Sequence, residues 1–127
     1  MVQAAGLSIP GRAFAVQVAN SVYVIQAESS PSMQCLTNIS AQSATSTAKA
    51  RPSQRVAPGA ANFNNECLFV GGGADANGRG GVVLSTVDMY RPANDTWSAA
   101  PKLNQARYGV SFCAAGANLY ALFGLTD

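Results

Sequence analysis

Short runs of alternating apolar and polar residues recur along this chain, with turn-forming residues between them. Side chains of a β-strand point alternately to its two faces, so a period of two predicts half-buried strands. Three segments each contain two such runs around a turn with Asn or Gly, which predicts a β-hairpin. They are "GRAFAVQVANSVYVIQA" (11–27), "QRVAPGAANFNNECLFVGGG" (54–73) and "ARYGVSFCAAGANLYALFG" (106–124).

The same alternation sets the expected strands. The hairpin strands are 13–18 with 22–25, 57–63 with 68–71, and 108–114 with 119–123. Two more strands are expected after the central hairpin, "VVLSTVDMY" and "DTWSAA", with a Pro-Ala-Asn turn between them. After Ile25 the pattern predicts no definite strand. Because no helical periodicity of useful length is present, the sequence predicts an all-β protein with four short strands per repeat.

The three hairpin segments also share their first and last features, which indicates an internal repeat. Each opens with an arginine: Arg12, Arg55 and Arg107. Each closes with an apolar run around an aromatic residue: Tyr23, Phe69 and Tyr120. The segment that precedes and includes the arginine is also repeated. "VQAAGLSIPGR" and "WSAAPKLNQAR" have the same length, and both carry two early alanines.

The central repeat carries a more specific motif. A diglycine follows an apolar strand, a later strand ends in tyrosine, and a tryptophan follows a polar turn. The residues are Gly71, Gly72, Tyr90 and Trp97, with Arg107 after them. This motif resembles the kelch repeat, whose units of about 50 residues are the four-stranded antiparallel blades of a β-propeller. The resemblance implies that the glycines allow close backbone approach and that Tyr90 and Trp97 pack one blade against the next.

The resemblance divides the chain into about two and a half blades of one partial kelch-like β-propeller, residues 1–127. Residues 1–11 are the end of a preceding blade, 12–54 a degenerate blade, 55–106 a full blade, and 107–127 the first two strands of a third. The first blade departs from the pattern, since Gln26-Ala27 stands where the diglycine belongs and no tryptophan precedes Arg55. We expect a fragment of a larger propeller or a subunit of a larger assembly.

Composition limits the partners and the chemistry. Charged residues make up 11% of the 127 residues and the net charge is +2, too weak to favour nucleic acid or an anionic membrane surface. No apolar run approaches the ~18 residues of a membrane span. The chain has no histidine, so neither a Ser-His-Asp triad nor a Cys-His pair can form within it. We therefore predict no catalytic residue, no metal and no cofactor.

The cysteines and the glycine-rich loop are interpreted as structural features, without a metal or phosphate site. Cys35, Cys67 and Cys113 form no CxxC pair and are expected to be small buried hydrophobic residues. "GGGADANGRGG" lacks both the Gly-Lys-Ser/Thr sequence and a following helix, so it does not predict a phosphate site. Two sequons, at Asn38 and Asn94, are possible glycosylation sites if the chain is secreted.

The repeated arginines are the candidate binding residues. The resemblance implies that residues at the place of Arg12, Arg55 and Arg107 line the mouth of a central channel, where converging guanidinium groups bind carboxylates. The alternative is that these arginines are solvated or locally hydrogen bonded. Polar residues of the loops could add contacts: Asp75, Asn77, Arg79, Asn104 and Gln105.

These observations favour a non-enzymatic protein-interaction or structural scaffold module. Its expected partners are other proteins, or neighbouring subunits that complete the propeller, in an extracellular setting or a large assembly. One alternative is the propeller part of a galactose-oxidase-like extracellular enzyme, whose copper site needs histidines that this chain lacks. Another is a carbohydrate-binding protein that uses exposed aromatic residues such as Tyr108.

Overall fold

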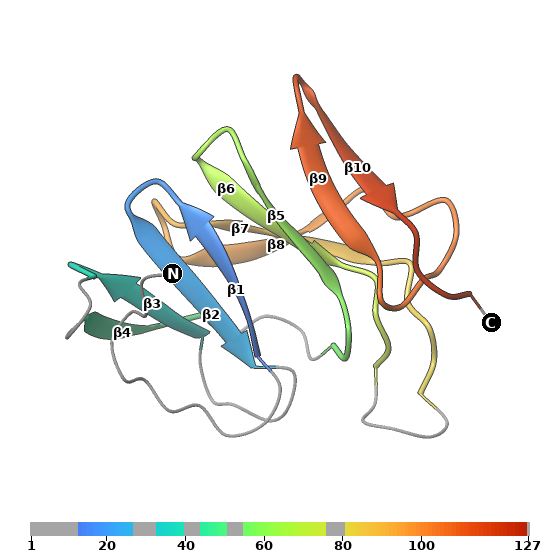
Figure 1. The fold of residues 1–127 in the computed structure, drawn as a ribbon, viewed down its shortest axis with the longest axis horizontal. Coiled ribbons are helices and arrows are strands. Elements are labelled where there is room, and N and C mark those ends of the chain that lie inside the picture. Colours follow the sequence, from blue (N-terminus) through green and yellow to red (C-terminus); the bar gives the residue numbers. More distant parts are fainter. Residues whose placement is uncertain (1–12, 27–32, 40–43, 51–54, 76–80, 127) are drawn as a thin grey trace, which may run out of the picture.

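The protein is built from antiparallel β-sheets. The computed structural model describes residues 13–26, 33–39, 44–50, 55–75 and 81–126. Within these ranges the chain forms two four-stranded sheets and one two-stranded sheet, with no helix (Figure 1). The described residues accordingly include no helix long and apolar enough to cross a membrane. The all-β prediction is confirmed at this level.

Sheet 1 contains four strands in chain order. They are β1 (Ala13–Val18), β2 (Ser21–Gln26), β3 (Met33–Thr37) and β4 (Thr45–Lys49). The first two match the predicted hairpin. The other two lie in the stretch where the alternation predicts no definite strand, and β4 is mostly exposed. An exposed strand lacks the apolar half of the period-two pattern, so its sequence carries little strand signal.

Sheet 2 has the same order and follows in the chain. Its strands are β5 (Gly59–Phe63), β6 (Cys67–Gly71), β7 (Val87–Arg91) and β8 (Thr96–Ala100). Strand β5 begins later than predicted because Ala57 has a φ of 52°, which interrupts the extended backbone. Strand β7 is shorter than predicted, since Val83 forms only an isolated bridge with Ala74.

The third sheet is a single hairpin. Its strands are β9 (Ser111–Ala115) and β10 (Asn118–Leu122). Strand β9 starts after the predicted position because Gly109 has a φ of 67°. In the part of the chain that the structure describes, β10 pairs with β9 alone, so its other edge carries no strand.

The three sheets stack face to face, and their first strands are neighbours. Strand β5 contacts β1 on one side and β9 on the other (Figure 1). The core between sheets 1 and 2 takes alternate residues from facing strands. Its buried members are Val16, Val18, Tyr23, Ile25, Met33, Cys35, Leu68, Val70 and Tyr90. Since side chains alternate across a strand, the opposite face of sheet 2 presents Phe69 and Val87 to the β9–β10 hairpin.

Positive-φ glycines form the corner where β6 leaves sheet 2. Gly73 has a φ of 82°, and a Cβ at this position would lie 2.5 Å from the Val56 carbonyl oxygen. Its amide donates to the Arg107 carbonyl oxygen at 2.6 Å. A Cβ on Gly72, with a φ of 65°, would lie 2.8 Å from the same Arg107 oxygen. Gly72, the second residue of the predicted diglycine, and Gly73 therefore allow the third repeat to pass close against the second.

We expect Gly73→Ala to lower the free energy of unfolding by at least about 3 kcal/mol, because it adds both a left-handed φ and a backbone clash. Gly116→Ala is the matched control, since its φ is 59° but no atom lies within 4 Å of an added Cβ. The control should lose only the conformational term, roughly 1–2 kcal/mol. Urea unfolding of both variants measures the difference, and equal losses would refute the close-approach explanation.

Candidate functional site

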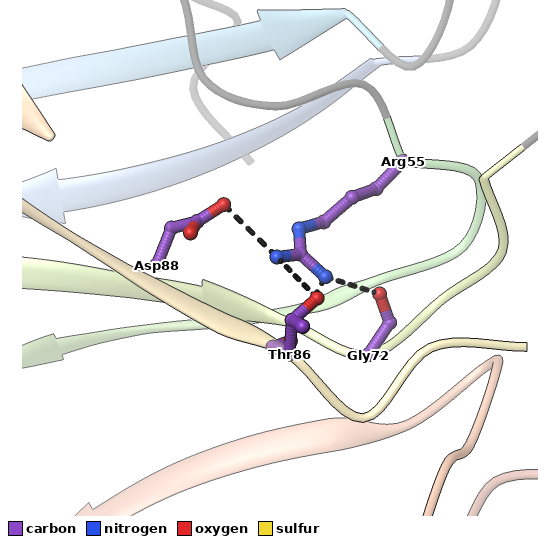
Figure 2. A network of polar contacts seen from close by, with 4 residues as sticks. All are labelled: Arg55, Gly72, Thr86 and Asp88. Carbon is purple, nitrogen blue, oxygen red and sulfur yellow. Dashed lines mark hydrogen bonds and ion pairs between the residues drawn. The ribbon is translucent and has the colours of Figure 1, made fainter. Parts of the chain in front are cut away.

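Arg55 lies inside the protein, held by sheet 2. It is 4% exposed. Nη1 donates to the carbonyl oxygens of Gly72 and Thr86, both at 2.9 Å. Nη2 donates to Thr86 Oγ1 at 3.1 Å and to Asp88 Oδ2 at 2.9 Å, the latter an ion pair (Figure 2). One guanidinium thus joins the end of β6 to the start of β7.

The geometry around Arg55 fits a structural role in this repeat. A buried guanidinium needs partners for its charge and its donors, and Asp88 supplies the charge. Only Nε has no partner among the described atoms. Because its two terminal nitrogens are occupied by the chain itself, Arg55 has no free terminal nitrogen with which to bind an external carboxylate bidentately.

Arg107 occupies the equivalent position of the third repeat but has fewer partners. Its Nη1 donates to the Phe123 carbonyl oxygen at 3.0 Å, as Arg55 Nη1 donates to Gly72. In the described chain this is the one hydrogen bond of its guanidinium. Arg107 is half-buried. It therefore offers open donor positions that Arg55 does not.

Two of the predicted loop residues lie with Arg107. Asn104, Gln105 and Arg107 line a cavity of about 270 Å³ at one side of β10. Asp75 does not line this cavity, and its Oδ1 accepts from the Val82 amide at 2.8 Å. The remaining candidates fall outside the described residues: Arg12, Asn77 and Arg79.

The predicted motif residues Tyr90 and Trp97 lie between the two four-stranded sheets. Tyr90 is fully buried, and its ring meets the Tyr23 ring of sheet 1 edge-on, with centroids 5.5 Å apart. Trp97, its cross-strand neighbour, is half-buried with its ring centroid 5.0 Å from that of Tyr90. We call Tyr23, Tyr90 and Trp97 the aromatic cluster. It joins sheet 1 to sheet 2 through apolar burial and ring contact.

Hydrogen bonds from Asp95 and Trp97 hold the aromatic cluster in register. Trp97 Nε1 donates to the Ala50 carbonyl oxygen at 2.9 Å. Asp95 Oδ1 accepts from the Ala50 amide at 2.8 Å and from the Tyr90 hydroxyl at 2.7 Å. Residues of the β7–β8 hairpin therefore bind both backbone groups of Ala50, the residue that follows β4.

Titration behaviour follows from these contacts. Burial, then interactions with Cys35, raise the pKa of Tyr23 to about 12. Burial and the hydrogen bond to Asp95 raise the pKa of Tyr90 far above its ordinary value. The Ala50 amide, then the Tyr90 hydroxyl, lower the pKa of Asp95. A lowered carboxyl pKa stabilises the fold above the ordinary aspartate pKa, and this contribution is lost as pH falls through the lowered value.

A second cavity of about 280 Å³ lies between sheet 2 and the β9–β10 hairpin. Its wall is mainly apolar, with one lysine. The lining residues are Phe69, Val87, Ala100, Pro101, Lys102, Leu103, Phe112, Leu119 and Ala121. It adjoins the cavity of Arg107, because both share Lys102, Leu103, Leu119 and Ala121. Together they form one groove beside the edge of β10 that no described strand covers.

The burial of the cysteines and of the two sequon asparagines can be compared with the prediction. Cys35 and Cys67 are buried as expected, but the prediction that Cys113 is buried is wrong. Cys113 lies on the face of the β9–β10 hairpin that points away from sheet 2, where no described element covers it. Asn38 and Asn94 are both exposed, and the Asn94 side chain accepts from the Thr96 hydroxyl.

Two further searches, for a metal site in the described part of the chain and for similar proteins, found no match. Within the described ranges, no group of three or more His, Cys, Asp or Glu residues gathers to hold a metal ion. No protein-family model matches the chain, and no curated protein matches it.

Sequence reasoning missed the partners that complete these contacts. Asp88 and Thr86 bind Arg55, and Asp95 binds Tyr90 and Ala50. A signal for the first pair was present, because Asp88 and Tyr90 are two residues apart on one face of β7, and Thr86, just before β7, continues the same spacing. For Asp95 the signal was weaker, since turns are commonly rich in aspartate.

We expect Arg55→Met to lower the free energy of unfolding by about 3 kcal/mol, because it leaves Asp88 and the carbonyl of Gly72 without their partner. Arg107→Met is the matched control at the equivalent position. It loses one hydrogen bond near solvent and should cost about 1 kcal/mol or less. Chemical denaturation compares the two variants, and similar costs would contradict the structural role of Arg55.

Proposed function

We propose that this chain is a non-enzymatic interaction or scaffold module made of kelch-type β-propeller blades. The observation that carries the proposal is the repetition of one packing arrangement. Sheet 2 packs on sheet 1 through one face and on the β9–β10 hairpin through the other, with the first strands β1, β5 and β9 side by side. Blades around a propeller axis are arranged in this way.

The kelch-type motif supports the same proposal at the level of side chains. Tyr90 and Trp97 act between neighbouring sheets. The motif glycines Gly71 and Gly72 allow the next repeat to approach, since an added Cβ would lie 3.0 Å from the Phe112 ring or 2.8 Å from the Arg107 carbonyl oxygen. These are packing roles, which leave the two outer surfaces and the loops for binding. The function proposed here therefore depends on surfaces that a neighbouring protein covers, without a reaction centre.

An uncovered apolar face supports association with neighbouring subunits or other proteins. On the β9–β10 hairpin, the face that points away from sheet 2 carries Tyr120, 47% exposed, and Leu122, 42% exposed. Tyr120 is the third residue of β10, as Tyr23 is the third residue of β2. Tyr23 packs against the next sheet, so Tyr120 is proposed to pack against the next protein surface.

Acidic groups are the ligand chemistry proposed for the loops. Arg107 has open donors, and Asn104 and Gln105 line the same cavity. Guanidinium and amide donors together bind carboxylates well. This role is assigned to Arg107, while Arg55 has a role in folding.

The proposal predicts association through the outer face of the β9–β10 hairpin. Sedimentation velocity over a concentration series should detect species larger than the 13.0 kDa chain. Tyr120→Lys should abolish them, because it buries a charge at the contact. Ala93→Lys, in the exposed β7–β8 turn, should not. A chain that stays at 13.0 kDa at every concentration would count against this function.

A further inference from the structure

We propose that the groove beside β10 docks a strand of another polypeptide with the pattern Thr-x-Asp-x-Tyr. The strand would pair antiparallel with the free edge of β10, insert its tyrosine into the apolar cavity and place its aspartate on Arg107. This inference rests on the proposed function as an interaction module, and it names the recognition chemistry of one surface. The second repeat supplies the template for the third.

Backbone geometry establishes the correspondence between the two repeats. Gly72 and Phe123 have φ values of 65° and 62°, and Gly73 and Gly124 have φ values of 82° and 94°. The bridge between Val56 and Ala74 has its counterpart in the bridge between Tyr108 and Leu125. Because these features match in order, the environment of Arg55 indicates what the environment of Arg107 requires.

Arg107 makes one of the four kinds of hydrogen bond that Arg55 makes. Both guanidinium groups donate to the carbonyl at the end of the second strand, Gly72 or Phe123. Arg55 then uses Asp88 of β7 and Thr86, the residue before β7 (Figure 2). No described strand lies beside β10 to supply these two residues to Arg107. A strand carrying threonine and aspartate two residues apart would complete the set.

The apolar cavity corresponds to the place that Tyr90 fills in the other interface. Tyr90 packs on Tyr23, the third residue of β2. Phe69 is the third residue of β6, and it lines the cavity of about 280 Å³ instead of contacting a ring from the next sheet. An aromatic side chain entering from the free edge of β10 would contact Phe69 as Tyr90 contacts Tyr23.

Strand register places both groups at once. In sheet 2, Tyr90 pairs with Leu68 and Asp88 pairs with Val70. Their counterparts in β10 are Leu119 and Ala121, the second and fourth residues, and both line the cavity. A strand in the same register therefore sets tyrosine opposite Leu119 and aspartate opposite Ala121. The period of two puts both side chains on the cavity side.

A second copy of β10 fits this groove less well. Its sequence, "NLYAL", contains no acidic residue, so antiparallel pairing of two β10 edges leaves Arg107 without a carboxylate. Lys102 also lines the groove, which adds to the demand for negative charge. Charge complementarity therefore favours an acidic strand from a different segment.

The probe is a synthetic peptide with the sequence of residues 84–100, "LSTVDMYRPANDTWSAA", added to the full chain at concentrations where sedimentation shows a monomer. Calorimetry should detect saturable binding. Peptides with Asp88→Asn or Tyr90→Ala should bind at least about tenfold more weakly, as should the protein variant Arg107→Met. The protein variant Arg91→Met, changed at an exposed arginine that lines neither cavity of the groove, should bind normally. Equal binding of all peptides would overturn the proposal, as would absence of peptide binding together with no effect of the strand when it is covalently linked to the chain.

A version of the chain with the strand covalently attached tests docking even if the free peptide binds too weakly to be detected. Joining residues 81–101 to Asp127 through a short Gly-Ser linker raises the effective concentration of the strand. Amide exchange of β10 should then slow, and the Asp88→Asn change in the added copy should reverse the effect. Unchanged exchange in the linked chain would overturn the docking site. Tyr120 also lines the Arg107 cavity. The Asp88→Asn and Tyr90→Ala changes lie in the added strand and leave Tyr120 unaltered, so they report on docking separately from the Tyr120→Lys test of self-association.

Discussion

The contact between sheets is the constraint on which this structure depends. A sheet of four short strands with few charged residues has two faces to cover, and it cannot bury either one alone. The aromatic cluster of Tyr23, Tyr90 and Trp97 closes the first interface, and Asp95 and Ala50 tie its edge through three hydrogen bonds. The chain thereby becomes a stack of sheets whose stability lies between neighbours as much as within each one.

Arg55 and the glycine corner serve that stacking from inside sheet 2. The guanidinium connects the end of β6 to β7. This fixes the position of β7, the strand that carries Tyr90, relative to β6. Gly73 lets the backbone of Arg107 come within hydrogen-bond distance, which carries the chain into the next repeat. Arg55 therefore has a folding role in the second repeat, and the binding role of Arg107 in the third repeat is our proposal.

Much of the fold follows from local pattern, and much of the site does not. Period-two alternation located the three hairpins because each has one buried face, whereas β4 is exposed and lacked that signal. Strands β5 and β9 begin later than predicted because Ala57 and Gly109 have positive φ. The Gly109 amide donates to the Ala57 carbonyl oxygen, a tertiary contact that alternation does not encode. The repeated arginines were recognised in the sequence, but the difference between a buried Arg55 and a half-buried Arg107 depends on which strand lies beside each.

The most direct test of the central claim is a double-mutant cycle between Tyr23 and Tyr90, which lie in different sheets. The cycle compares the free energies of unfolding of Tyr23→Leu, Tyr90→Leu and the double variant. If ring contact joins the sheets, the two changes should be coupled by about 1 kcal/mol. Additive losses, with coupling below about 0.3 kcal/mol, would contradict the claim that the aromatic cluster holds one sheet to the next.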